Sequence, residues 1–255
     1  MAGCFTTFEA LVLRETKYKE ADRILTLYTK EKGLITVKAP GALRKNSKIG
    51  AATQQLSYSD MTILSRAGMM TVTEAVFKES FRGLRESFEN YALGCYFAEC
   101  VEAMSPEEMP DPDIMQLILN SLYALANNLY SPKLIKAAFE MRLMCILGYE
   151  PDLSGCRVCG KETPERPVLG YETGYLACRE CRNAPIGPTD YLCSESLSAM
   201  RYICSAPAKK LFGFAADEEA LHRLSIACEH YIISQSERGF GTLDYWKKID
   251  TGYSK

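Results

Sequence analysis

Four cysteines in the second half of the chain have the types and spacing needed to hold a metal ion. They form two Cys-x-x-Cys pairs, Cys156 with Cys159 and Cys178 with Cys181. Two thiolates three residues apart on a tight turn can both reach one ion, and a second pair completes four sulfur ligands at about 2.3 Å. Because such a set leaves no open coordination position, the spacing predicts one structural Zn²⁺ rather than a catalytic ion. Chance thiols and a redox pair are the alternatives.

Short strands and turns must bring the two cysteine pairs together. Gly160 follows the first pair, at a position where a tight turn favours a residue without a Cβ. The segment between the pairs is apolar around Gly170 and Gly174, which favours a hairpin that returns the second pair to the first. We therefore expect a zinc ribbon inserted at about residues 152–188.

The composition is typical of a soluble globular protein. The chain has 255 residues, of which 47% are hydrophobic, so it can bury the core of one large domain or two smaller ones. No apolar run approaches the roughly 20 residues that span a bilayer, and the first residues do not resemble a signal peptide. A cytoplasmic location is the expectation. Most of the seven further cysteines fall on apolar stripes and are expected to be free thiols in a reducing compartment.

The charge is distributed unevenly along the chain, although the formal net charge is only -2. Residues 1–80 contain 12 lysines and arginines against 8 aspartates and glutamates, whereas the remainder contains 18 against 24. The N-terminal third is therefore basic and the rest is acidic.

Five short strands are predicted in the first eighty residues. Apolar and β-branched residues with turn signals between them mark strands at 5–13, 24–29, 34–39, 55–64 and 69–77. Five strands joined by turns are typical of a small barrel, and five is the count of the OB-fold. The polar, basic loop at residues 42–52, with Arg44, Lys45 and Lys48, has no apolar periodicity and is expected to be exposed and mobile.

Beyond Ser80 the period of the apolar residues changes from two to about three and a half, which indicates helices. They are predicted at about 88–104, 113–129, 132–147, 194–204 and 217–232, and no helix is predicted in the tail from Gly239. The predicted fold class is α+β multidomain. A five-stranded OB-fold barrel at 1–80 is expected to bind nucleic acid, and an all-α domain at 81–255 is expected to carry the Cys4 zinc ribbon.

The basic barrel has the residue types that single-strand binders use. OB-type barrels pair a basic groove with exposed aromatic rings on which bases stack. The candidates are Lys30, Lys32, Lys38, Arg44, Lys45 and Lys48, with Tyr28 and Tyr58 close in sequence. The alternative is an ordinary solvated surface, with the tyrosines packed inside the barrel.

No catalytic residues are predicted, so the chain is expected not to be an enzyme. Gly-rich phosphate loops, Gly-x-Ser-x-Gly and His-Glu-x-x-His are missing from the sequence. His222 and His230 fall on the last long predicted helix without a nucleophile or metal partner beside them, which favours surface or packing roles. The acidic run from Asp217 to Glu219 is most simply a favourable first helical turn.

Two longer runs resemble the bacterial recombination mediators of the RecO family, in their zinc-containing form. The first run reads Ala10-Leu11-Val12-Leu13-Arg14-x-x-x-Tyr18-x-Glu20-x-Asp22-x-x-Leu25-Thr26-Leu27-Tyr28-Thr29-x-x-x-Gly33-Leu34. The second reads Glu140-x-Arg142-Leu143-x-x-x-Leu147-Gly148-Tyr149-x-Pro151 and leads into Cys156-x-x-Cys159. With the order of barrel, helices and ribbon, the resemblance covers essentially the whole chain.

The resemblance implies a recombination mediator of RecF-pathway DNA repair, cytoplasmic and associated with the nucleoid. Such a protein binds single- and double-stranded DNA, anneals complementary strands, and works with RecR to load RecA on DNA coated by the single-strand-binding protein. It implies zinc ligation by the four cysteines and a DNA-facing surface that includes Arg14, Tyr18, Lys30, Lys38 and the basic loop. It also implies a contact with the C-terminal tail of the single-strand-binding protein, for which Lys133, Lys136 and Arg142 are candidates.

One departure from the family pattern concerns the end of the third predicted strand. The sequence Lys38-Ala39-Pro40-Gly41 shifts the glycine that often stands next to the lysine. DNA affinity is therefore expected to depend more on the basic loop or on partners. Two other functions are compatible with the residues: a zinc-ribbon scaffold that binds only proteins, and a nucleic-acid-processing enzyme with an unrecognised site.

Overall fold

The computed structural model describes residues 3–181 and 187–252, so part of the predicted ribbon segment, residues 182–186, lies outside the described residues. The chain forms two compact units. The first contains Met1–Ala126 and Gly241–Lys255, and the second contains Asn127–Phe240. The barrel therefore shares its unit with the helices that directly follow it.

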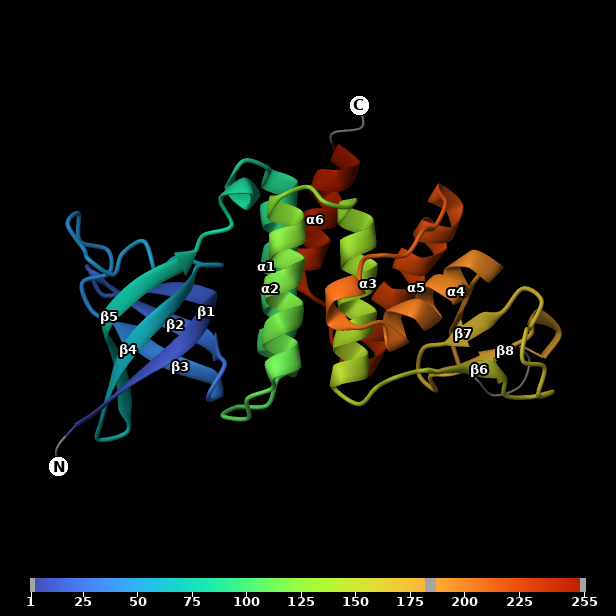
Figure 1. Cartoon of the computed structure of the whole chain (residues 1–255), viewed down its shortest axis with the longest axis horizontal. Coiled ribbons are helices and arrows are strands. Elements are labelled where there is room, and N and C mark those ends of the chain that lie inside the picture. Colours follow the sequence, from blue (N-terminus) through green and yellow to red (C-terminus); the bar gives the residue numbers. More distant parts are fainter. Residues whose placement is uncertain (1–2, 182–186, 253–255) are drawn as a thin grey trace. The chain divides into compact units, whose positions relative to one another are not determined.

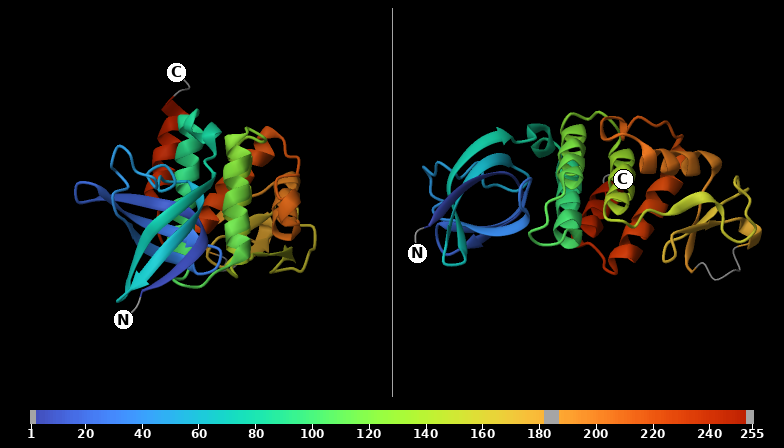
Figure 2. Two further views of the ribbon diagram at one scale, coloured as in Figure 1. Left: turned by 60° about the vertical axis from the view of Figure 1, so that its left-hand side comes forward. Right: turned by 60° about the horizontal axis from the view of Figure 1, so that its bottom comes forward.

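Five strands close into the predicted barrel (Figures 1 and 2). They are β1 (Cys4–Tyr18), β2 (Asp22–Thr29), β3 (Gly33–Ala39), β4 (Tyr58–Arg66) and β5 (Met69–Glu79). Their order is β1-β2-β3-β5-β4, and β4 pairs with β1 to complete the ring. The β3–β5 pair is parallel, whereas the other pairs are antiparallel. This arrangement is OB-like and confirms the predicted architecture.

Alternating side chains fill the barrel. Val12 on β1, Leu25 and Leu27 on β2, and Val37 on β3 are all buried in its core. The first strand extends further than the sequence indicates, because the polar residues up to Tyr18 pair with β2 in a regular hairpin. Backbone pairing with a neighbouring strand thus overrides the polar, turn-like composition of this segment.

The basic loop after β3 is not the freely exposed segment that its composition suggests. Ala42 and Ile49 belong to the barrel core, and Ala52 is also buried. The loop is further held by backbone hydrogen bonds, including one of 2.9 Å from the Leu43 N–H to the Ala21 carbonyl oxygen. Its apolar residues are spaced too irregularly to form a pattern, but they suffice to fix the loop against the barrel.

Three α-helices complete the first unit: α1 (Phe88–Met104), α2 (Pro112–Ala126) and α6 (Gly241–Gly252). A short 3-10 turn, η1 (Arg82–Arg85), precedes α1, and the Ser87 side chain caps this helix. Helix α6, for which no helix was predicted, packs beside α1 (Figure 1). Leu243 and Trp246 are buried in α6, and the Glu99 carboxylate on α1 accepts a 3.0 Å hydrogen bond from the Thr242 N–H.

The second unit combines three α-helices with a small sheet. The helices are α3 (Pro132–Ile146), α4 (Ser194–Ser205) and α5 (Glu218–Ser236), and 3-10 turn η3 (Ala208–Lys210) follows α4. The four-stranded sheet has the order β6-β8-β7-β9, with bounds β6 (Asp152–Cys156), β7 (Val168–Gly170), β8 (Tyr175–Ala177) and β9 (Thr189–Tyr191). The antiparallel β7–β8 pair is the hairpin predicted between the cysteine pairs. A 3-10 turn, η2 (Arg179–Cys181), follows β8.

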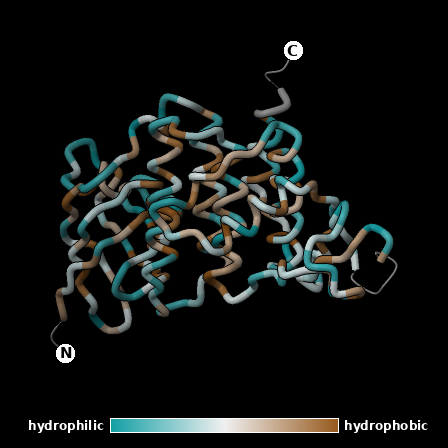
Figure 3. Tube along the Cα trace, turned by 45° about the vertical axis from the view of Figure 1, so that its right-hand side comes forward, coloured by the Kyte–Doolittle hydropathy of each residue, from teal (hydrophilic) through white to brown (hydrophobic). Residues whose placement is uncertain are grey.

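The hydropathy of the trace follows these elements (Figure 3), with hydrophilic residues concentrated in the connecting loops. Among the described residues, no helix combines the length and apolar character required to cross a bilayer.

A lysine with two carboxylates is buried where α3 meets α5. Lys136 is completely buried, and its Nζ lies 2.9 Å from a carboxylate oxygen of Glu140 and 2.9 Å from one of Glu229. Burial alone would lower the pKa of Lys136, but the two carboxylates outweigh it and raise the pKa, so the ammonium stays charged.

We expect Lys136→Met to lower the free energy of unfolding by about 3–5 kcal/mol, since it leaves two buried carboxylates without their cation. Chemical denaturation followed by circular dichroism measures the change. Lys133→Met, at an exposed position on the same helix, is the matched control. Equal stabilities of the two variants would contradict the role assigned to the buried ammonium.

Candidate metal centre and nucleic-acid interface

The four predicted cysteine ligands converge at the edge of the small sheet. The Sγ atoms of Cys156, Cys159, Cys178 and Cys181 all lie within 4.8 Å of one another. Those of Cys159 and Cys178 are 3.7 Å apart, close to the sulfur–sulfur separation of about 3.8 Å expected for four ligands 2.3 Å from a tetrahedral ion. The donor set therefore fits a tetrahedral ion such as zinc.

Each cysteine pair lies on a turn that follows a strand. Cys156 ends β6, and the Gly160 N–H donates a 2.9 Å hydrogen bond to the Cys156 carbonyl oxygen. Gly160 has a φ of 74°, a left-handed conformation that costs a residue without Cβ little. The second turn follows β8, where the Cys181 N–H donates to the carbonyl oxygen of Cys178 at 3.0 Å. Pairing of β8 with β6 and β7 fixes the two turns against each other.

The backbone around Cys156 is arranged for a thiolate. Burial by itself raises the pKa of this thiol, but hydrogen bonds from the backbone N–H groups of Cys159, Cys178 and Val158 lower it to about 6. The Cys178 N–H lies 3.3 Å from the Cys156 sulfur. Metal ligands must be deprotonated, so these N–H groups favour the binding form of the cysteine.

Five of the predicted DNA-binding residues gather at one edge of the barrel, near the β1–β2 turn. The Lys38 Nζ lies 2.9 Å from an Asp22 carboxylate oxygen and 5.4 Å from the centre of the exposed Tyr18 ring. The Gly41 N–H donates to the same Asp22 side chain at 2.8 Å, which brings the basic loop to this edge. We call this surface the basic barrel edge; it consists of Tyr18, Lys19, Lys38, Arg44, Lys45 and Lys48.

The loop cations of the basic barrel edge are available to a ligand. Arg44, Lys45 and Lys48 are exposed, and within residues 3–181 and 187–252 none of them pairs with a carboxylate. Lys19, which the sequence analysis did not select, also lies beside the Tyr18 ring, with its Nζ 5.4 Å from the ring centre. Lys19 directly follows Tyr18 in the charged, turn-like run between the first two predicted strands, and this position was the sequence signal that could have identified it.

Arg14 and Lys30 lie elsewhere on the barrel. The Arg14 guanidinium makes a bidentate ion pair with Glu102 of α1, with a shortest N–O distance of 2.6 Å. A phosphate would have to displace this carboxylate. Lys30 lies at the opposite end of the β2–β3 hairpin and its Nζ is 3.6 Å from Glu9. Lys38 pairs with Ile24 near the start of β2, whereas Lys30 follows the end of this strand. The offset of six residues between Ile24 and Lys30 corresponds to roughly 20 Å along a strand.

The two tyrosines considered as stacking platforms belong to the barrel packing. Tyr28 is completely buried, and its hydroxyl donates to the Asp111 carbonyl oxygen at 3.2 Å. Tyr58 donates a hydrogen bond to the Glu9 carboxylate. Tyr18 is therefore the exposed ring at the basic barrel edge.

The three predicted partner-binding residues do not form one surface. Lys136 is buried in the ion-pair cluster described above, so it is not accessible to a partner. Arg142 is half-buried, and its guanidinium donates to the Ala206 carbonyl oxygen at 2.5 Å. Both side chains instead make contacts within the second unit.

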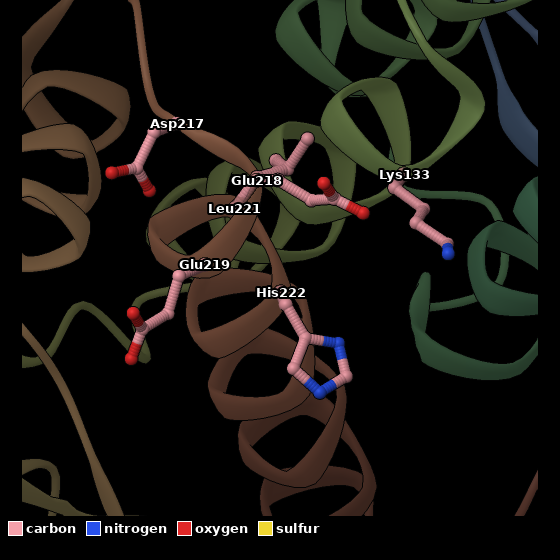
Figure 4. Close-up of a pocket in the computed structure, with 6 residues that line it drawn as sticks. All are labelled: Lys133, Asp217, Glu218, Glu219, Leu221 and His222. Carbon is pink, nitrogen blue, oxygen red and sulfur yellow. The ribbon is translucent and has the colours of Figure 1, made fainter.

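Lys133 is exposed and lines a pocket at the start of α5 (Figure 4). In the close-up, Glu218 and His222 extend to the side of α5 nearer Lys133, whereas Asp217 and Glu219 extend away from it. Because three carboxylates line this pocket, its electrostatics oppose an acidic peptide. The Asp217 side chain accepts a 2.7 Å hydrogen bond from the Ala220 N–H and so caps α5, while Glu218 and Glu219 lie in the first turn, as the sequence predicts for this acidic run.

The second histidine has a structural partner. The Nδ1 atom of His230 lies 2.7 Å from a carboxylate oxygen of Asp190 on β9, and the Tyr171 ring lies beside the imidazole. These contacts join α5 to the small sheet and agree with a packing role.

Comparison with known proteins identifies relatives over the whole chain. The family model described as "Recombination protein O N terminal" matches residues 1–81, and "Recombination protein O C terminal" matches residues 85–244. The chain is 32% identical to "DNA repair protein RecO" of Acetivibrio thermocellus, over 94% of this chain and 95% of the relative. It is 29% identical to the protein of the same name from Dehalococcoides mccartyi, over 95% of this chain and 96% of the relative.

We expect Cys178→Ser to abolish metal binding by the cysteine cluster and to lower the free energy of unfolding by on the order of 4 kcal/mol. Elemental analysis and chemical denaturation measure the two effects. Cys4→Ser, which removes an exposed thiol at the start of β1, should change neither. Full metal content in Cys178→Ser would show that the four thiols do not share an ion.

Proposed function

The chain belongs to the RecO family, and from this premise we propose that it acts in DNA repair and recombination as a mediator without catalytic activity. In this proposal residues 1–80 form the nucleic-acid-binding domain, and residues 81–255 form the helical domain with the ribbon at about 152–188. The proposed tasks are binding of single- and double-stranded DNA, annealing of complementary strands, and loading of RecA together with RecR on DNA coated by the single-strand-binding protein. The proposed location is the cytoplasm, at the nucleoid.

The basic barrel edge is the observation that carries this proposal. Its three loop cations have no carboxylate partners among the described residues, and the loop backbone is bonded to the β1–β2 turn through Gly41 and Leu43. At the same turn, Lys19 and Lys38 lie against the exposed ring of Tyr18. Cations of this kind neutralise phosphates, and an exposed ring offers a stacking surface for a base of any sequence. Arg14 and Lys30 are not part of the proposed DNA contact, because they lie away from this edge and already have carboxylate partners.

Strand annealing requires that two phosphate backbones approach while their base edges stay free to pair. Exposed lysines and arginines lower the repulsion between the strands but do not read the bases. No bond has to be made or broken, so the mechanism needs neither a nucleophile nor a general base. The physical contribution of the protein is to raise the local concentration of two strands on one positively charged surface.

The ion at the cysteine cluster is proposed to be zinc, with a structural role. Cys156, Cys159, Cys178 and Cys181 supply four sulfur ligands, so no position is left for a substrate or a water. The ion would fix the two turns of the ribbon, whose cysteines pack against Val168 and Ala177. Of the candidates for the tail of the single-strand-binding protein, Lys133 is the exposed one, so a contact there would have to use its ammonium on the side away from the three carboxylates that line its pocket.

Annealing of two labelled complementary oligonucleotides tests the proposed activity, measured with and without a cognate single-strand-binding protein. We expect the protein to accelerate annealing without strand cleavage or nucleotide hydrolysis. Absence of any DNA binding would favour the protein-only scaffold, and a chemically altered product would indicate an enzyme; either result would overturn the proposal.

We expect reversal of the three loop charges, in Arg44→Glu/Lys45→Glu/Lys48→Glu, to weaken binding of single-stranded DNA. The slope of log affinity against log salt should become less steep by about 0.7 for each phosphate that the variant no longer neutralises. Titrations of a labelled oligonucleotide at several salt concentrations measure both quantities.

The matched control is Lys209→Glu/Lys210→Glu, which reverses two exposed charges on η3 in the other unit. Its salt slope should stay near that of the unmodified protein. If both variants lose affinity equally, the effect comes from net charge and the basic barrel edge is not the binding surface.

A further inference from the structure

A second group of sulfur and oxygen ligands lies outside the cysteine cluster of the ribbon. Cys145 lies in the last turn of α3, Cys204 in the last turn of α4, and Glu150 on the segment that leaves α3. Their ligand atoms, two Sγ atoms and a carboxylate oxygen, all lie within 4.8 Å of one another. All three residues belong to the same compact unit.

The turn after α3 places Glu150 back beside Cys145. The Gly148 N–H donates to the Cys145 carbonyl oxygen at 3.1 Å, and the Tyr149 N–H donates to that of Met144 at 2.8 Å. This pair of bonds is the Schellman arrangement that ends a helix, and the φ of 86° at Gly148 suits it. The Tyr231 hydroxyl donates a 2.9 Å hydrogen bond to the Tyr149 carbonyl oxygen, which further fixes the segment. The position of Glu150 therefore follows from a defined backbone structure.

The α4 side of the group is fixed equally well. Helix α4 packs against α3, and the Arg201 guanidinium donates to the Leu153 carbonyl oxygen at 2.6 and 2.9 Å. This arginine, one turn before Cys204, ties the first ribbon strand to α4. The two thiols thus come from packed helices, which restricts their relative movement.

We propose that Cys145, Cys204 and Glu150 form a second metal site, which binds a zinc-like divalent ion and leaves one coordination position to water. Two thiolates and one carboxylate are a donor set that such ions accept. The separations allow all three ligand atoms to reach one ion. Since the fourth position is open to water, the ion is held more weakly and exchanges more readily than the one with four sulfur ligands.

The chemistry of the two thiols is consistent with this assignment. A hydrogen bond with Cys145, together with burial and the charge of Glu150, raises the pKa of Cys204 above its ordinary value. Metal ligands must be deprotonated, so an ion that binds here displaces thiol protons to the solvent and its affinity increases with pH.

The site has a route to solvent. Cys204 and Glu150 line a surface cavity of about 610 Å³ together with Pro151, Asp152 and Arg201. Glu150 is exposed, whereas both cysteines are partly buried. A hydrated ion can enter from this cavity, lose part of its water shell to the carboxylate, and then reach the thiols.

Titration with Co²⁺ under reducing conditions tests the second site in the full-length protein, with the ion of the ribbon cluster left in place. We expect one additional Co²⁺ per chain, with sulfur-to-cobalt charge-transfer absorption and the intense visible bands of tetrahedral cobalt. Cys145→Ser and Cys204→Ser should lose this absorption. Glu150→Gln should bind the additional ion more than about tenfold more weakly, because it loses a charged ligand.

Two variants serve as controls. Cys4→Ser removes an unrelated exposed thiol, and Asp152→Asn neutralises a carboxylate of the same cavity; both should bind the additional Co²⁺ as the unmodified protein does. Circular dichroism and the content of the ribbon metal verify that each variant is folded.

Three results would overturn the second site. One is that no Co²⁺ binds beyond the ribbon cluster, and another is that the charge-transfer absorption persists in Cys204→Ser. The third is a Cys145–Cys204 disulfide that survives the reducing conditions, detected as two missing thiols by peptide mapping. Each of these outcomes is independent of whether the protein anneals DNA.

Discussion

The parallel pairing of β3 with β5 is the constraint on which the proposed DNA-binding surface depends. Adjacent parallel strands cannot be joined by a tight turn, so the chain leaving β3 must first pass through another segment. Here that segment comprises residues 40–57 and then β4, which closes the ring on β1. The connection packs Ala42 and Ile49 into the barrel core and exposes its arginine and lysines. Barrel closure therefore also determines where the unpaired cations are presented.

The ribbon of the second unit combines short strands with four cysteines. The ribbon strands are only three to five residues long, and the core beside its cysteines is small. The proposed ion, held by four thiols on two turns, would supply an additional constraint, in the way that metal ions commonly do in small domains. The segment after α3 leads first past Glu150 and then to Cys156, so one stretch of chain contributes to both the closed and the proposed open metal site. The proposed open site is expected to exchange its metal ion faster than the four-cysteine site, because it lacks a fourth protein ligand.

Local features of this protein could be predicted from sequence, whereas features that depend on tertiary contacts could not. The cysteine pairs were identifiable because metal geometry restricts spacing within a few residues, and the β7–β8 hairpin follows from its glycines. By contrast, Lys136 looked like a surface residue, because a buried lysine becomes acceptable only when carboxylates from α3 and α5 meet it. Helix α6 was missed because its buried residues, Leu243 and Trp246, are recognisable as one face only beside α1. The pairing of Cys145 with Cys204 depends likewise on helices that are distant in sequence.

Hydrogen–deuterium exchange with and without a single-stranded oligonucleotide would show whether DNA meets one edge of the barrel. We expect DNA to slow exchange in the β1–β2 turn and in residues 38–50, while exchange in the β2–β3 turn around Lys30 remains unchanged. Protection confined to the β2–β3 turn, or found only in the second unit, would contradict it.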